Sequence, residues 1–235
     1  MKTAAVAVCL ALICSCATTR SGEKTQEAIA HYKIGVSYLN ENKVQQAFVE
    51  MHKALELDPH NKEVLTAIGI IYLLHFEEPQ KSVEYFEKAA KEDRDYSEAY
   101  NNLGYAYEKM GRYDEAIAFY HKALSNPLYP TAEKAYINLG NAYYRLRKYD
   151  SAIASFREAI KRAPDLGIPY LRLALCFNSL GKYGDAAAAM NQAIRLEPAY
   201  KGSRERAVDD FTVRKLRAGG FEEQDLRDYL EILKY

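Results

Sequence analysis

Residues 103–107 read Leu-Gly-Tyr-Ala-Tyr, and this spacing of a glycine and a tyrosine recurs along the chain. Four glycines are each followed three residues later by a tyrosine, and the glycines lie 34 to 36 residues apart. A period of about 34 residues is typical of a repeated helix-turn-helix unit. The pairs are Gly35 and Tyr38, Gly69 and Tyr72, Gly104 and Tyr107, and Gly140 and Tyr143.

This period, with Ala, an aromatic residue and Pro at fixed distances after the glycine, resembles the tetratricopeptide repeat. The resemblance implies an all-α fold, a right-handed α-solenoid of about five repeats with C-terminal capping helices. We expect the repeats to occupy residues 28–200, with starts near residues 28, 62, 97, 133 and 167.

The packing of each repeat can be predicted from its small and large residues. The eighth residue is Gly in four repeats and Ala in the fifth, and the twentieth is Ala or Ser, so the two helices of a repeat can approach closely. Larger first-helix residues, from Ile34 to Leu173, should fill the interface. The second helices should add Met51, Phe86, Tyr120, Phe156 and Met190, and Ala54, Ala89, Ala123, Ala159 and Ala193 should allow the next repeat to pack.

The N-terminus carries the features of a bacterial export signal. The apolar run Ala4 to Cys14 is too short to span a bilayer, which favours a signal peptide over residues 1–15. Residues 13–16 read Ile-Cys-Ser-Cys and resemble a lipobox, which implies lipidation of Cys16 by diacylglycerol and an acyl chain such as palmitate. A plain secretory signal cleaved near Ala17 is the alternative. Residues 16–27 are predicted to be the lipidated Cys and a flexible tether.

Composition and residue chemistry exclude several function classes. The 32 basic and 32 acidic residues give no net charge, which argues against a nucleic-acid partner. The five histidines are scattered without carboxylate or thiol neighbours at metal-ligand spacing, so we expect no metal and no cofactor. Cys176 lies between two apolar residues and is predicted to be a buried thiol without a disulfide partner. No catalytic motif is present, so we expect no enzyme activity and no small-molecule substrate.

The first helix of every repeat should line the concave side of the solenoid, where a protein partner would bind. The predicted lining is apolar in repeats one and two, which suits an amphipathic helix or an extended apolar segment, and more polar in repeats three and four. A charge at Val36 or Leu73 is expected to abolish binding without unfolding the protein. Alternatively, the tether or the C-terminal helices cover some of these residues. The predicted groove comprises Tyr32, Val36, Leu39, Ile70, Leu73, Leu74, Asn101, Tyr105, Asn141 and Tyr144.

Residues 201–235 should form a degenerate repeat and capping helices. A helix over 201–218 would bury Val208, Phe211 and Leu216, and a second would run over 222–233. The alternative is a partner-binding tail that uses the apolar residues of the second helix. Those residues are Leu226, Tyr229, Leu230 and Leu233.

The combination of lipobox, chain length, tandem repeats and the loop with Leu128, Tyr129 and Pro130 resembles the pilotin lipoproteins of type IV pilus biogenesis. This resemblance implies a monomeric adaptor that binds an outer-membrane secretin subunit and assists its assembly. Ala17, where inner-membrane lipoproteins often carry Asp, favours an outer-membrane anchor facing the periplasm of a Gram-negative bacterium. The alternatives are an adaptor for barrel assembly, peptidoglycan hydrolase scaffolding or polysaccharide export, or a structural oligomer built by end-to-end stacking.

Overall fold

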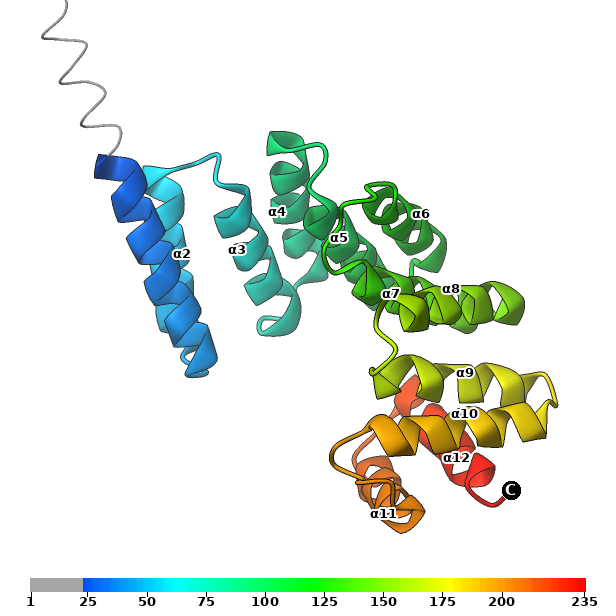
Figure 1. Cartoon of the computed structure of the whole chain (residues 1–235). Helices are drawn as coiled ribbons and strands as arrows, with labels where there is room; N and C mark the ends of the chain where they lie inside the picture. Colours follow the sequence, from blue (N-terminus) through cyan, green and yellow to red (C-terminus); the bar gives the residue numbers. More distant parts are fainter. Residues whose placement is uncertain (1–22) are drawn as a thin grey trace, which may run out of the picture. The chain divides into compact units, whose positions relative to one another are not determined.

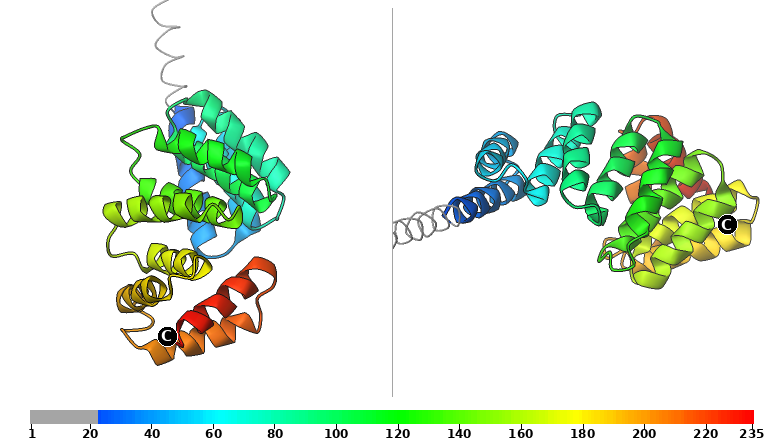
Figure 2. Two further views of the ribbon diagram at one scale, coloured as in Figure 1. Left: turned by 90° about the vertical axis from the view of Figure 1, so that its right-hand side faces the viewer. Right: turned by 90° about the horizontal axis from the view of Figure 1, so that it is seen from above.

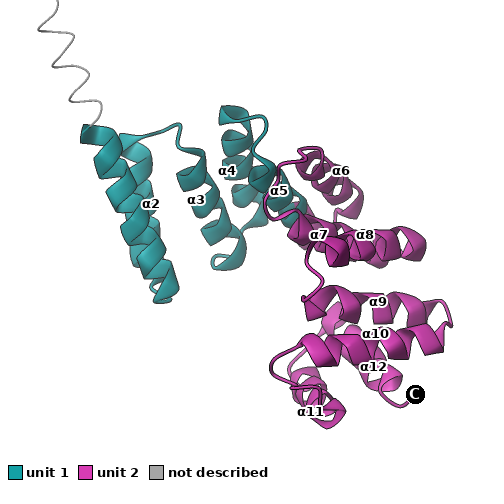
Figure 3. Ribbon diagram, viewed as in Figure 1, with its two compact units in different colours: residues 1–106 teal, residues 107–235 magenta. Residues whose placement is uncertain are grey.

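The computed structural model describes residues 23–235, and within this range it contains α-helices and no β-strand. The chain divides into two compact units, residues 1–106 and 107–235, with the boundary inside one helix (Figure 3). The predicted signal peptide, the lipobox and Cys16 lie outside the described residues. The lipid anchor therefore stays a prediction.

Among the described residues a helix over residues 23–40 comes first, and eleven further helices follow it (Figure 1). Unit 1 continues with α2, α3 and α4, and ends within α5. The bounds are α2 Val44–Leu57, α3 Lys62–Leu74, α4 Pro79–Glu92, α5 Ser97–Lys109, α6 Tyr113–Leu124, α7 Ala132–Arg145, α8 Tyr149–Arg162, α9 Gly167–Ser179, α10 Tyr183–Leu196, α11 Arg204–Lys215 and α12 Gly220–Ile232.

The helix order confirms a tetratricopeptide-repeat architecture. α3, α7 and α9 each pack against the second helix of their own repeat and against the second helix of the repeat before it. Predicted repeat starts coincide with the first residues of α3, α5 and α9, and α7 begins one residue early. The helix over 23–40 begins before the expected start at residue 28, because residues 23–27 contain good helix formers and neither Gly nor Pro.

Small residues bring the helices of each repeat together as predicted. A Cβ atom on Gly35 would lie 2.9 Å from Cε of Met51, which shows how little space separates the first helix from α2. The alanines predicted to allow stacking, from Ala54 to Ala193, are all fully buried. The predicted second-helix core is confirmed as well, since Met51, Phe86, Tyr120, Phe156 and Met190 are at most 1% exposed.

Ile34 departs from the predicted core, with 44% of its surface exposed. Its counterpart Ile68 is buried in a cluster with Ala47 and Met51 of α2, in the preceding repeat. Within the described residues no repeat precedes the helix over 23–40. Ile34 therefore has no second helix against which to pack.

The C-terminal helices α11 and α12 form a cap on unit 2, and they pack against each other, as the left view of Figure 2 shows. Phe211 of α11 is fully buried, whereas Leu216 is 79% exposed, because α11 ends at Lys215 and leaves Leu216 beyond its apolar face. Leu226 and Tyr229 of α12, and Leu233 directly after it, belong to the same buried cluster as residues of α9 and α10. These three residues are thus used within the fold.

Candidate protein-binding surfaces

The predicted groove residues of unit 1 all lie on first helices of repeats. This set, which we call the unit 1 face, spans the helix over 23–40, α3 and the part of α5 in unit 1. It comprises Tyr32, Val36, Leu39, Ile70, Leu73, Leu74, Asn101 and Tyr105.

The members of the unit 1 face differ in accessibility. Leu74 is 51% exposed, and Ile70 is partly exposed. Val36 and Leu39 pack against the core formed by α2 and α3 while remaining partly exposed. Leu73 is only 6% exposed, so the expectation that a charge there would leave the protein folded is not supported. Asn101, 9% exposed, is likewise part of the interior.

Carboxylates lie close to the tyrosines at one end of the unit 1 face. Burial raises the pKa of Tyr32, and Glu63 and Glu98, in the first turns of α3 and α5, raise it further. Burial raises the pKa of Tyr96 to about 12. Lys62 donates to Asp93 at 2.5 Å and lies over the Tyr96 ring. Acidic groups thus lie at the Tyr32 end of the unit 1 face.

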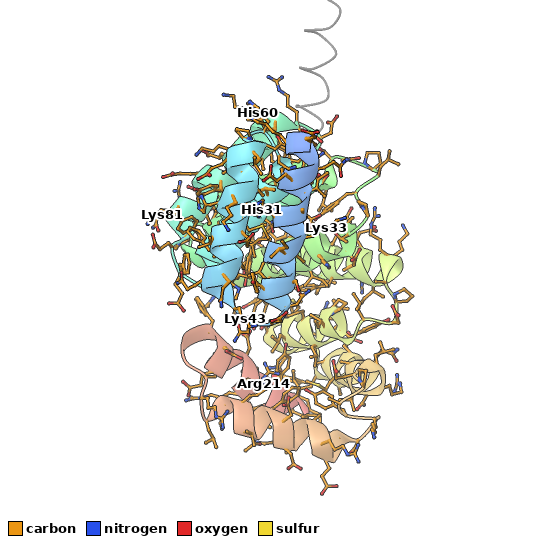
Figure 4. All side chains as sticks on the ribbon, turned by 90° about the vertical axis from the view of Figure 1, so that its left-hand side faces the viewer. His31, Lys33, Lys43, His60, Lys81 and Arg214 are labelled. Carbon is orange, nitrogen blue, oxygen red and sulfur yellow. The ribbon has the colours of Figure 1, made fainter. Side chains whose placement is uncertain are left out.

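The helix over 23–40 is joined to α2 by a polar contact as well as by its core. His31 hydrogen-bonds Oε2 of Glu50 through Nδ1 at 2.5 Å, and Lys53 donates to the other oxygen at 2.7 Å. Figure 4 shows His31 on the first helix where it borders α2. Because its imidazole is used for this contact, His31 has a structural role.

In unit 2 one of the two predicted lining residues, Tyr144, lies against the C-terminal cap. Asn141 and Tyr144 are on α7, and Tyr144 packs against the cluster that includes Leu226 and Tyr229 of α12. Burial, and next the nearby Asp225 carboxylate, raise the pKa of Tyr144. The alternative in which C-terminal helices cover part of the lining is therefore correct for this unit.

Asp225 of α12 joins two repeats through a buried ion triad. Arg145 of α7 donates to its two oxygens at 2.8 and 2.6 Å, and Arg172 of α9 donates at 2.8 Å. The Asp225 side chain is 5% exposed. Sequence reasoning missed this triad because its members lie 80 and 53 residues apart. An Asp directly before Leu226 on the apolar side of a capping helix was the available signal.

The loop between α6 and α7 separates its two predicted contact residues. The Leu128 amide donates to the side chain of Asn126 at 2.9 Å, and the Tyr129 amide donates to the Asn126 carbonyl at 3.2 Å. This turn leaves Leu128 83% exposed and Tyr129 5% exposed. Only Leu128 is accessible to a partner.

Residues 23–235 contain neither a candidate metal-binding site nor a candidate membrane-spanning helix. No group of three His, Cys, Asp or Glu residues in that range could hold a metal ion. No helix there is both long and apolar enough to cross a bilayer. Cys176 is fully buried, and burial raises the pKa of its thiol to about 12, so it is a poor nucleophile in the folded protein.

Curated relatives match this chain over part of its length. The type IV pilus assembly protein PilF of Pseudomonas aeruginosa is 31% identical over 101 residues, which are 43% of this chain and 40% of PilF. The photosystem I assembly protein Ycf3 of a Synechococcus strain is 30% identical over 95 residues, which are 39% of this chain and 54% of Ycf3. The chain thus spans only about half the length of these relatives.

Solved structures extend the similarity of fold over most of the chain. The crystal structure of PilW, described as a type IV pilus biogenesis factor, has a TM-score of 0.71 at 22% identity and covers 86% of this chain and 90% of that one. The structure of P. aeruginosa PilF has a TM-score of 0.67 at 23% identity and covers 87% and 98%. At these identities the match establishes the fold.

Three family descriptions, each of a tetratricopeptide repeat, match residues 28–61, 95–165 and 137–201. Together they cover more than half of the chain, and the helix pairs of both units agree with them. The chain belongs to the tetratricopeptide-repeat family, whose members bind protein partners.

Proposed function

We propose that this protein is a scaffold for type IV pilus biogenesis, anchored through Cys16 to the outer membrane and facing the periplasm, where it binds a secretin subunit. The partial match to PilF and the shared fold with PilW support the pilus assignment. The lipobox residues 13–16 support the anchor. The protein acts as a pilotin, so it assists secretin assembly without catalysing a reaction.

One contrast between the units carries the choice of binding surface. In unit 2 the apolar first-helix residues Leu171 and Leu175 pack beneath α12. In unit 1 no comparable helix within the described residues covers Leu74, Ile70 and Val36. Accessible apolar side chains on adjacent first helices suit an amphipathic helix or an extended segment of a partner. The unit 1 face is therefore the proposed secretin site.

The test pairs two substitutions of equal exposure. Leu74 and Val49 are each 51% exposed, but Leu74 lies on the unit 1 face and Val49 lies on the second helix α2. Leu74→Glu should abolish co-isolation of the secretin from gently solubilised envelopes, whereas Val49→Glu should retain it. Circular dichroism should show both variants folded. Equal recovery of the secretin with both variants would remove the unit 1 face from the proposal.

A second arm tests the anchor and the pathway. Cys16→Ala should move the protein from the membrane fraction to the soluble periplasmic fraction, and deletion of the gene should reduce secretin multimers. Recovery of barrel-assembly, hydrolase or export components without a secretin would assign the scaffold to another envelope machine. The match to Ycf3, an assembly protein of photosystem I, shows that similar repeats occur in more than one assembly pathway.

A further inference from the structure

α12 makes contacts that the second helix of an ordinary repeat does not make. It packs against its neighbour α11, and also against α9 and α10 of the preceding repeat. Its Asp225 reaches one repeat further, to Arg145 of α7. α12 therefore lies across the first helices of two successive repeats, on the side where tetratricopeptide repeats bind ligands.

The residues beneath α12 form what we call the α7–α9 face. It combines apolar and aromatic side chains with two arginines, and it consists of Tyr144, Arg145, Leu171, Arg172 and Leu175. α12 supplies an acidic residue followed by apolar residues at the spacing of a helix. These are Asp225, Leu226, Tyr229 and Ile232.

The ion triad makes this contact selective for an acidic helix. Two guanidinium groups share one carboxylate, and Phe221 of α12 lies over the Arg145 guanidinium, 4.6 Å from its central carbon to the ring centroid. Without α12, Arg145 and Arg172 would lose the carboxylate that both of them bind, and the buried Glu108, whose pKa burial raises, would be the acidic group left near them. Because uncompensated charges that are partly buried are costly, this surface favours a ligand that returns a carboxylate.

The link between α11 and α12 is exposed and contains glycine. Leu216 in this link is 79% exposed. A Cβ atom on Gly219 or Gly220 would meet nothing within 4 Å, and Gly220 has a positive φ of 56°. The two glycines are therefore not required by close packing, and they provide a hinge with unusual backbone freedom.

We propose that the α7–α9 face is a second binding site, which takes an acidic amphipathic helix from a protein partner, and that α12 occupies this site in the free protein. The partner helix carries Asp or Glu in place of Asp225, with apolar residues one, four and seven positions later. It must cover the apolar surface that α12 leaves, including Phe211, whose ring stacks on Tyr229. This site is in unit 2 and is independent of the unit 1 face.

The first test uses the full chain and a fluorescent peptide of residues 219–235. The tethered α12 competes at a high effective concentration, so the peptide should bind the wild-type chain weakly. Leu226→Ala in the chain removes buried contacts of α12 and should strengthen peptide binding at least about thirtyfold. Asp225→Asn, which keeps the size of the side chain, serves as the second variant if Leu226→Ala does not fold.

Arginine substitutions then locate the bound peptide. Adding Arg172→Gln to the Leu226→Ala chain should weaken peptide binding at least about thirtyfold, because it removes one partner of a buried charge pair. Arg157→Gln on α8, an exposed arginine, is the matched control and should change nothing. The proposal is overturned if the folded Leu226→Ala chain binds no better than the wild type, or if Arg172→Gln leaves binding unchanged.

The buried thiol of Cys176 reports movement of α12 in the wild-type chain. Cys176 belongs to the cluster that α12 covers. Peptide mass spectrometry can follow the alkylation of Cys176. At low urea concentrations the rate of alkylation should not depend on the urea concentration, and Asp225→Asn should increase this rate. Alkylation that rises with urea in proportion to global unfolding in both chains would show that α12 does not open separately, and would overturn the proposal.

Discussion

The Cε1 atom of Phe86 lies 2.5 Å from the position that a Cβ atom on Gly69 would take, closer than two carbon atoms can approach. In unit 2, a Cβ atom on Gly140 would lie at the same distance from Cε1 of Phe156. Each ring therefore packs directly on the backbone of the first helix of its repeat. Neither residue has a positive φ, so the backbone conformation does not require glycine at these positions. The close contact between the helices does.

Gly69→Ala should destabilise unit 1 because the new methyl group must displace a fully buried ring. Overpacking of this kind costs about 1–3 kcal/mol, and urea unfolding followed by circular dichroism measures it. Gly184→Ala is the control, because a Cβ there meets nothing within 4 Å and alanine favours the helix. Equal stability of Gly69→Ala and wild type would show that Phe86 can move aside at no cost.

The repeats could be predicted from the sequence because their information is local and periodic. A glycine, a tyrosine and an alanine at fixed spacing specify how two adjacent helices meet, and α3, α5 and α9 begin at the predicted residues. The residues of the unit 1 face lie on the first helices of their repeats for the same reason. Their accessibility was not predictable, because Leu73 and Leu74 are adjacent in sequence but differ in exposure, at 6% and 51%.

The surface in unit 2 could not be predicted from the repeat pattern. Periodicity places Tyr144 and Arg145 on the lining of repeat four, but it contains no information on α12, which reaches them from 80 residues away in sequence. The two arginines and Asp225 have no repeated counterparts. Contacts of this kind depend on how the chain folds back after its last regular repeat. The spacing of residues within a repeat does not predict this path of the chain.

His52 should make unit 1 less stable as the pH falls. Its Nε2 atom is buried without a hydrogen-bond partner, and its ring contacts Phe48 and lies near Tyr85. Burial lowers the pKa of His52, and the Glu56 carboxylate offsets this only in part. The unfolded chain thus binds the proton more tightly, and stability is lost as the pH falls through the ordinary histidine range to the lowered pKa.

The measurement for His52 compares wild type with His52→Phe in urea unfolding between pH 8 and pH 5. Wild type should lose more free energy of unfolding than the variant as the pH falls, and the difference should be greatest at the acidic end. Parallel pH profiles for the two proteins would mean that His52 remains neutral or gains an acceptor when protonated. This outcome would remove it as a source of acid sensitivity.

Glu108 should have the opposite pH dependence in unit 2. Burial raises the pKa of its carboxyl, although the Tyr120 hydroxyl donates to Oε2 at 2.8 Å and nearby arginines favour the charge. The unfolded state releases its proton first, so stability decreases as the pH rises from the ordinary glutamate range to the raised pKa. Glu108→Gln keeps an acceptor for Tyr120 and should be more stable than wild type at pH 7.

Thermal unfolding of wild type and Glu108→Gln at pH 4 and pH 7 measures this effect. The variant should gain stability relative to wild type as the pH rises. Tyr120→Phe is the complementary control, because it removes the hydroxyl that donates to Glu108. This variant should lose more stability than wild type between pH 4 and pH 7. A variant that is less stable than wild type at pH 7 would show that the arginines fully compensate the buried carboxylate.

The turn before α7 predicts different roles for two adjacent residues. Leu128 is 83% exposed, so Leu128→Ser should change the free energy of unfolding by less than about 0.5 kcal/mol. Tyr129 is 5% exposed, and Tyr129→Ala should cost about 2–4 kcal/mol because it leaves a cavity. Urea unfolding measures both changes. Since Leu128→Ser leaves the fold intact, any loss of partner binding in that variant would assign Leu128 a direct contact, whereas unchanged binding would restrict the interaction to the first-helix surfaces.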